Sequence, residues 1–335
     1  MDPEHAIAAI GQELAAAKYR FTPVGSATRR RVNVRGGNDL AHTLVEVFGW
    51  GRPWVPGLVP DRMTKWLERA GALHFSGGKL WSRVGFSTIG DHLFAHSADG
   101  VAGDPSPWPA HAGCGPDAWR YAALLRLVST SAQMAVELNC GCGIGGMTIA
   151  AQVRRVVMAD ADPVARLLAR ANALIAKVDH VQVVAGPGID DALAEAAGPL
   201  GPSAGEDGEG DGRPETPDLL IAGFGRDMPI EAAAAPVPAA AWVRAALAYF
   251  AAQAKAGAGA GQVVAYAVVP VNHGEDPLWR AVGRALVEAD PAVAYEEIDP
   301  DLPPDALPPE SLPPGVGEIP PERTAAVGIV ARLRA

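Results

Sequence analysis

The chain has 335 residues, of which 49% are hydrophobic and 20% are charged, and its formal net charge is −10. These values predict a packed globular protein of one or two domains and argue against a general nucleic-acid binder. No apolar run is long enough to cross a membrane, the acidic start lacks the basic region of a signal peptide, and three cysteines are too few for a disulfide framework. We therefore expect a cytoplasmic protein without a membrane partner.

The first 112 residues predict a small α+β domain of winged-helix-like type. A helix starts the chain, with Asp2 as its cap and Pro3 in its first turn. The spacing of apolar residues then predicts two short helices followed by a hairpin, at residues 39–50, 59–71, 79–87 and 90–97. The basic run at residues 28–35 is expected to be a solvated loop or strand face, with a polyanion site as the alternative. A linker rich in Gly and Pro follows at residues 100–116.

The remainder of the chain alternates between strands and helices. Continuous apolar runs predict strands at residues 133–139, 154–160, 180–186, 216–224 and 261–271. Helices are predicted between them, most clearly at residues 163–178, 239–257 and 277–290. This order indicates a mostly parallel sheet covered by helices on both faces. The last two strands, 292–298 and 324–335, have no helix between them, which favours an antiparallel hairpin at one edge. The segments 198–217 and 299–321 are predicted to be loops.

One glycine-rich stretch, MAVELNCGCGIGGMTIAAQ at residues 134–152, lies between the first of these strands and a helix. A metal site on Cys140 and Cys142 is not expected, because a structural zinc ion needs four ligands and Cys114 is the only other cysteine. A nucleotide is the better interpretation, since the backbone N–H groups of such a turn face a ligand at the strand ends. The letters also satisfy the G-x-G-x-x-G pattern of NAD sites, which is weak evidence alone.

Two acidic residues favour a cationic nucleoside over NAD. Glu137 ends the strand before the turn, where it would repel a pyrophosphate and would suit an ammonium group. Asp160 ends the next strand, nineteen residues after Gly141, in a position that suits the two hydroxyls of a ribose. Together the two acids and the turn predict a site for a zwitterionic sulfonium nucleoside.

Three segments resemble motifs I, II and IV of class I S-adenosylmethionine-dependent methyltransferases: residues 136–146, 156–173 and 217–225. The branch with the release-factor glutamine methyltransferases is the most similar. The resemblance covers residues 113–335, and the preceding region is similar to the N-terminal domain of bacterial small-domain methyltransferases. It implies a Rossmann-like class I methyltransferase sheet at 113–335, a substrate-selecting domain at 1–112, and S-adenosyl-L-methionine as the cofactor.

The resemblance also implies roles for individual residues. The methionine moiety would be flanked by Glu137 and by the turn backbone, and the ribose would be bound by Asp160. The remaining cofactor-binding positions lie near the adenine, in the strand predicted at residues 216–224, or at the entrance of the site. In full, the implied set is Asp117, Arg120, Glu137, Asn139, Gly141, Gly143, Asp160, Ala161, Asp162, Gly186 and Gly223.

Two departures from the family pattern matter. Asn139 stands in place of the first glycine of the turn, and asparagine tolerates a positive φ better than most residues. The Asn-Pro-Pro-Tyr motif of the glutamine and adenine N-methyltransferases is absent, because residues 223–227 read Gly-Phe-Gly-Arg-Asp. No side-chain amide is available there to hold a planar nitrogen, so the resemblance does not extend to the methylation of release factors.

The expected activity is direct SN2 transfer of the sulfonium methyl to an acceptor. The acidic catalytic half favours a small molecule over a protein side chain, and a protein side chain over RNA. Candidate catalytic residues are Phe224, Arg226, Asp227 and His273, with His96 as a further candidate base. Each also has a structural interpretation, such as packing of Phe224 in the core. The alternative function is a methyltransferase-fold subunit that binds or regulates without catalysis.

Overall fold

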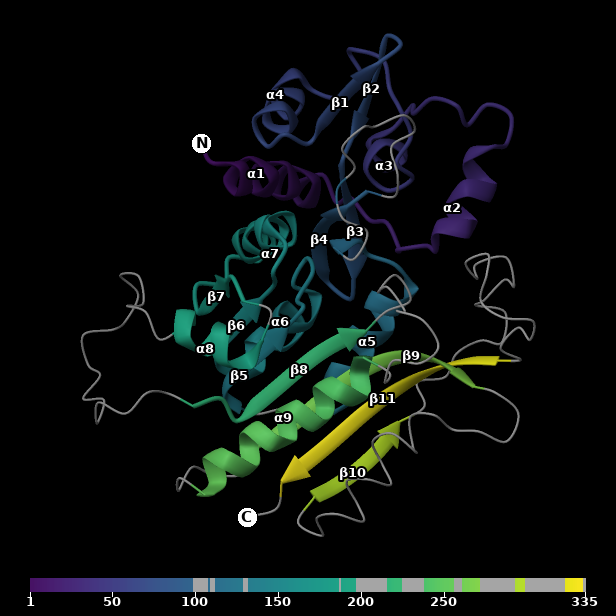
Figure 1. Cartoon of the computed structure of the whole chain (residues 1–335). Coiled ribbons are helices and arrows are strands. Elements are labelled where there is room, and N and C mark those ends of the chain that lie inside the picture. Colours follow the sequence, from purple (N-terminus) through teal and green to yellow (C-terminus); the bar gives the residue numbers. More distant parts are fainter. Residues whose placement is uncertain are drawn as a thin grey trace.

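The computed structural model describes residues 1–98, 108, 112–128, 132–186, 188–196, 216–224, 238–255, 261–271, 293–298 and 323–333. These residues form an N-terminal α+β region and a large sheet with helices on both faces (Figure 1). The predicted helix at residues 277–290 and the two predicted loops lie almost wholly outside the described residues. The fold is α/β, as the alternating pattern predicted.

The first helix, α1 (Pro3–Ala16), has the predicted buried face, but the Asp2 side chain makes no capping hydrogen bond. Asp2 is its N-cap residue with an extended backbone, and Pro3 stands in the first turn. Ile7, Ile10 and Leu14 are fully buried, because their spacing places them on the same side of the helix. This apolar face anchors α1 to the rest of the chain.

Three further helices follow in the N-terminal region: α2 (Ser26–Asn33), α3 (Leu44–Phe48) and α4 (Asp61–Arg69). The prediction of a loop or strand for the basic run is wrong. Residues 28–33 of this run lie in α2, which is fixed by tertiary contacts: Asn33 Nδ2 donates to the Trp50 carbonyl, and Arg29 is buried. Helix α3 is shorter than predicted, because Thr43 caps it by accepting a hydrogen bond from the Glu46 N–H.

Two small antiparallel sheets complete this region. Strand β1 (Leu73–Ser76) pairs with β2 (Lys79–Ser82), and β3 (Val84–Ile89) pairs with β4 (His92–Ser97). The single strand predicted at residues 79–87 is therefore two strands, and β1 was not predicted. The break falls at Arg83, whose N–H bonds to the Ala72 carbonyl, so that the residues on its two sides pair with different partners. The β3–β4 hairpin agrees with the prediction.

Among the described residues, the large sheet has seven strands in the order β10-β11-β9-β8-β5-β6-β7. Their bounds are β5 (Ala132–Leu138), β6 (Val153–Ala159), β7 (Val181–Val184), β8 (Leu219–Phe224), β9 (Gln262–Val271), β10 (Val293–Ile298) and β11 (Arg323–Leu333). Strands β5 to β9 are parallel, and β11 runs antiparallel to both β9 and β10. The predicted C-terminal antiparallel hairpin at one edge is confirmed.

The strand order reverses beside β5, which pairs with β6 on one side and with β8 on the other. Helix α5 (Pro116–Leu127), helix α6 (Ile144–Ile149), a short 3-10 turn (Ala150–Gln152) and helix α7 (Pro163–Ala176) lie on one face. Helix α8 (Ile189–Ala196), which was not predicted, and helix α9 (Pro238–Lys255) cover the other face (Figure 1). In open parallel sheets, ligands bind at the carboxyl ends of the strands where the order reverses. That place is the end of β5.

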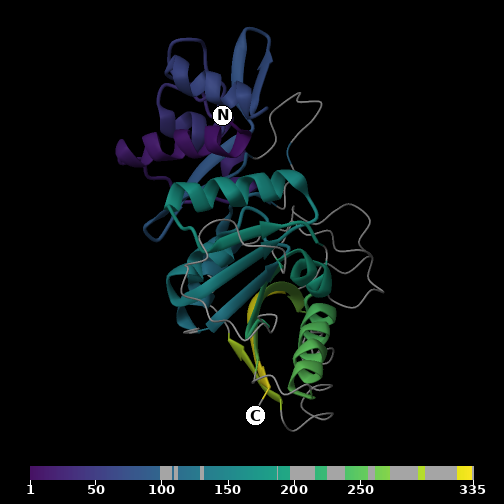
Figure 2. The ribbon, with the colours of Figure 1, turned by 90° about the vertical axis from the view of Figure 1, so that its left-hand side faces the viewer.

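The N-terminal region rests on α7. Helix α1 packs along α7, which lies between the N-terminal region and the sheet (Figure 2). Gln12 Nε2 donates to the Leu174 carbonyl at 3.2 Å, and Ile175 lies against Gly11. One hydrophobic cluster runs from α1 through β3 and β4 to α7 and the sheet. Among the described residues no helix is both long and apolar enough to span a membrane.

Candidate functional site

The glycine turn leaves the end of β5 and leads into α6. Asn139, Gly141 and Gly143 have φ angles of 51°, 54° and 81°, in the left-handed region. Asn139 thus adopts a positive φ, which asparagine was expected to tolerate. The Gly143 N–H donates to the Cys140 carbonyl at 2.7 Å, which closes the turn. The result is a compact main-chain bend at the point where the strand order reverses.

Gly143 is needed for close packing as well as for its φ angle. A Cβ atom there would lie 2.8 Å from Met158 Sδ and 3.2 Å from Ala169 Cβ. Both neighbours belong to the β6–α7 segment, so the turn is pressed directly against that segment.

We expect Gly143→Ala to destabilise the fold by about 1–2 kcal/mol from the left-handed backbone alone, with a further loss from the clash. Urea denaturation measures this free energy of unfolding, and Gly37→Ala is a matched control for the clash, because Gly37 has a φ of 85° and nothing lies within 4 Å of its added Cβ. A variant at position 143 as stable as the control would show that the turn has room for a side chain.

Glu137 lies under the N-terminal end of α6. Its side chain is 1% exposed, and Oε2 accepts a hydrogen bond from the Gly146 N–H at 2.7 Å. Gly145 is also constrained here, because a Cβ atom on it would meet Glu137 Oε1 and the Tyr121 hydroxyl. Burial raises the pKa of Glu137 to about 8, with a further increase from the Asp160 carboxylate, although the amides of α6 and Tyr121 oppose the shift. Burial therefore disfavours the ionised carboxylate near neutral pH.

Asp160 holds the other side of the turn. It is 4% exposed, its Oδ2 accepts from the Gly141 N–H at 2.9 Å, and its Oδ1 accepts from the Asp162 N–H at 2.9 Å. A carboxylate can accept about four hydrogen bonds, so two amide contacts are compatible with contacts to ribose hydroxyls. Of the two acids singled out in the sequence, Asp160 thus binds the predicted turn, and Glu137 binds the first turn of the helix that follows it.

The residues after Asp160 have local structural roles. The Asp162 side chain caps α7, because its Oδ1 accepts from the N–H groups of Val164 and Ala165 at 2.7 and 3.2 Å. Arg166, which sequence reasoning missed, donates to the carbonyls of Asp160 and Ala161 at 2.7 and 2.8 Å. It thereby fixes the backbone next to the predicted ribose and adenine positions. Gly186 follows the end of the neighbouring strand β7.

A second group of side chains lies at the start of α5. Asp117 Oδ1 accepts from Arg120 Nη1 at 3.2 Å and from the Tyr266 hydroxyl at 3.0 Å. The Tyr121 ring packs near Tyr266 and against Gly223, and burial together with the Glu137 carboxylate raises the pKa of Tyr121 far above its usual value. Asp117 and Arg120 are thus joined as a pair. The two tyrosines were missed, and the only sequence signal was the position of Tyr121 next to Arg120.

Of the four candidate catalytic residues, the structure describes Phe224. Phe224 is buried against Trp242 of α9, with ring centroids 5.9 Å apart, on the sheet face opposite Glu137. Its place therefore matches core packing. Arg226, Asp227 and His273 lie outside the described residues.

His96 does not suit the role of a base. Its Nδ1 donates to the Ser97 carbonyl at 2.8 Å, and the Ser87 hydroxyl lies 2.9 Å from Nε2. The side chain is buried within the β3–β4 hairpin, and this burial lowers its pKa to about 3. An imidazole that is neutral, buried and bonded at both nitrogens is a structural element of the N-terminal region.

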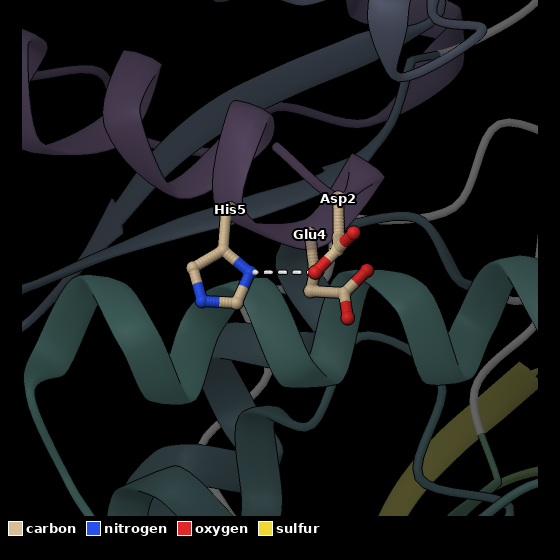
Figure 3. Close-up of side chains that lie close together, drawn as sticks. All are labelled: Asp2, Glu4 and His5. Atoms are coloured by element: carbon tan, nitrogen blue, oxygen red, sulfur yellow. Dashed lines mark ion pairs between the residues drawn. The ribbon is translucent and has the colours of Figure 1, made fainter.

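The three cysteines are free and buried, and burial raises the pKa of the Cys140 and Cys142 thiols well above the usual range. Within the described residues, the group of side chains with metal-ligand spacing is Asp2, Glu4 and His5, at the start of α1 (Figure 3). His5 Nδ1 lies 3.8 Å from Asp2 Oδ2, and Asp2 and His5 are exposed. Such exposed acidic groups are common without an ion.

No protein-family model matches the chain, and no curated protein matches it in sequence. Several solved structures have a similar fold. One is a Pyrococcus horikoshii protein assigned as a transferase, with 12% identity and a TM-score of 0.44, and the match covers 82% of this chain and 83% of that one. The M. jannaschii protein TYW2 in complex with AdoMet has 11% identity and a TM-score of 0.42, covering 76% and 87%. An O-methyltransferase from Bacillus cereus in complex with SAH has 18% identity and a TM-score of 0.38, covering 68% and 84%. At these values, function has to be argued from the residues of this chain.

Proposed function

We propose that the protein is an S-adenosyl-L-methionine-dependent methyltransferase. The observation that carries the proposal is the placement of two buried carboxylates on the two sides of one main-chain bend. Glu137, at the end of β5, contacts Gly146 N–H, and Asp160, directly after β6, contacts Gly141 N–H. Both lie at the carboxyl ends of parallel strands, where the strand order reverses.

The charge of this arrangement selects the kind of ligand. Glu137 beside the turn would, when ionised, repel the pyrophosphate of NAD, which reduces the case for a dinucleotide. A ligand ammonium beside Glu137 would instead stabilise its ionised form, which burial alone disfavours. The proposed ligand therefore combines a cation with a ribose, as S-adenosyl-L-methionine does.

The residues present fit this cofactor. Glu137 and the backbone of Asn139, Gly141 and Gly143 would hold its methionine moiety, and Asp160 would accept its ribose hydroxyls. Ala161, the Asp162 backbone and Gly186 would lie near the adenine, while Gly223 and the linked pair of Asp117 and Arg120 would border the site. When bound, the cofactor supplies an electrophilic methyl group that an acceptor attacks in line.

The contribution of the chain is to position the reactants. Alignment of an acceptor with the methyl group can supply about 7–11 kcal/mol of the barrier reduction in well-oriented cases. A small molecule is the first candidate acceptor, followed by a protein side chain and then RNA. Asp227 or His273 would act as the base for a hydroxyl or thiol acceptor.

The second candidate function is a subunit with this fold that binds or regulates without catalysis. Its support is the strand end at Gly223 and Phe224, where no side-chain amide is present and the phenyl ring is buried in the core. This alternative retains cofactor binding but predicts no transfer to an acceptor.

Isothermal titration calorimetry with S-adenosylmethionine, S-adenosylhomocysteine and NAD tests the proposal. We expect binding of the first two ligands and none of NAD, because only the first two carry an ammonium to pair with Glu137 and lack a pyrophosphate. Binding of NAD alone would overturn the assignment. Binding of the adenosyl ligands without methyl transfer to any of the three acceptor classes would favour the regulatory alternative.

A further inference from the structure

Asn172 connects three parts of the fold through one side chain. It lies in the third turn of α7 and is 1% exposed. Its Oδ1 accepts from the Ala95 N–H at 2.7 Å, and its Nδ2 donates to the Ala95 carbonyl and to the Cys142 carbonyl, both at 2.8 Å. We propose that Asn172 is a positioning residue that sets the glycine turn for cofactor binding and anchors it to the N-terminal region.

The contact with the N-terminal region resembles the pairing of a neighbouring strand. Strand β4 pairs with β3 along one edge, and the amide of Asn172 meets both backbone groups of Ala95 on β4. An asparagine amide can donate two N–H groups, and here both are used, one for β4 and one for the turn. A displacement of β4 would therefore also move the amide group that donates to the Cys142 carbonyl.

Two side chains of the β6–α7 segment hold the turn, and they bond to two consecutive residues of it. Asp160, just before α7, accepts from Gly141 N–H, and Asn172, within α7, donates to the carbonyl of Cys142. Ala169 lies one helical turn before Asn172 and packs against Gly143. The Gly141 N–H and the Cys142 carbonyl are thus both held by side chains of the same β6–α7 segment.

Loss of the Asn172 amide would leave a buried carbonyl of the turn without this donor. Buried polar groups that lose their partner move or bind water, since leaving them unpaired is costly. The backbone of Gly141 and Gly143 lies directly beside this carbonyl, and these are the residues proposed to contact the cofactor. Asn172 would therefore influence cofactor affinity without touching the cofactor.

The test compares Asn172→Ala with Ile10→Ala. Ile10 is fully buried in α1, so its truncation destabilises the same N-terminal contact without removing a bond to the turn. We expect Asn172→Ala to weaken S-adenosylhomocysteine binding at least fivefold and Ile10→Ala to change it less than twofold, when both are measured well below their melting temperatures. Equal affinities of the two variants would overturn the proposal.

Two additions keep the test decisive. Asn172→Asp is nearly isosteric and keeps the acceptor for Ala95 N–H but loses both donors, so it should show the same weakening if the alanine variant does not fold. Amide hydrogen exchange at residues 141–146 should accelerate at least fivefold in the Asn172 variants and not in Ile10→Ala. The affinity readout rests on the proposed function, whereas the exchange readout does not. If the parent binds no S-adenosylhomocysteine, the proposed function fails, and unchanged exchange would overturn this inference separately.

Discussion

Replacing Asp160 with alanine is expected to weaken binding of S-adenosylhomocysteine at least tenfold, or about 1.4 kcal/mol. The carboxylate is proposed to accept the ribose hydroxyls, and it also holds the turn through Gly141 N–H and Asp162 N–H. The alanine variant loses all of these bonds together. We also expect a fall in the free energy of unfolding of about 1–3 kcal/mol, because the Gly141 amide is left buried without this acceptor.

Calorimetry of the Asp160 variant measures the first effect, and urea denaturation measures the second. Asp179→Ala provides the matched control, since the Asp179 side chain is 89% exposed and lies beyond the end of α7. An unchanged dissociation constant in the Asp160 variant would refute the ribose assignment. A loss of stability with unchanged affinity would reduce Asp160 to a structural role in the turn.

Replacing Glu137 with glutamine is expected to change how stability depends on pH. The pKa of this carboxyl is 4.5 in an ordinary environment and about 8 in the fold, so the folded state holds the proton more tightly. The parent should therefore lose stability as the pH rises from about 4.5 to about 8, by roughly 1 kcal/mol per pH unit from this group. Glutamine keeps the acceptor for Gly146 N–H and does not ionise, so the variant should lack this part of the slope.

Urea denaturation of the parent and of Glu137→Gln at several pH values between 5 and 8 provides the measurement. The difference between their free energies of unfolding isolates Glu137 from the other titrating groups. We expect the variant to gain on the parent as the pH rises. Parallel curves would show that Glu137 is ionised in the fold over this range, and the argument that a ligand cation completes the site would lose its support.

Much of the fold was accessible from local sequence patterns. The strands from β5 to β9 are continuous apolar runs, and α7 has one apolar face. The spacing of the apolar residues and the order of the elements therefore predicted a parallel sheet. The turn, Glu137 and Asp160 were accessible for the same reason. Each lies at the end of a predicted strand or directly after it.

The remaining features depend on contacts between distant parts of the chain. The basic run became α2 through a bond to Trp50 and the burial of Arg29, although its composition suggested a solvated segment. The bonds of Asn172 to Ala95 span 77 residues, so no local pattern could have indicated them. Tyr266 appears in the sequence as one residue of an apolar strand, and only the fold brings it to Asp117.

The most direct test of the account is a crystal structure of the protein with bound S-adenosylhomocysteine. We expect the ligand ammonium beside Glu137, both ribose hydroxyls within hydrogen-bond distance of Asp160, and the chain from Asn139 to Gly143 against the ligand. A ligand bound elsewhere, or one whose sugar and ammonium contact neither carboxylate, would contradict it.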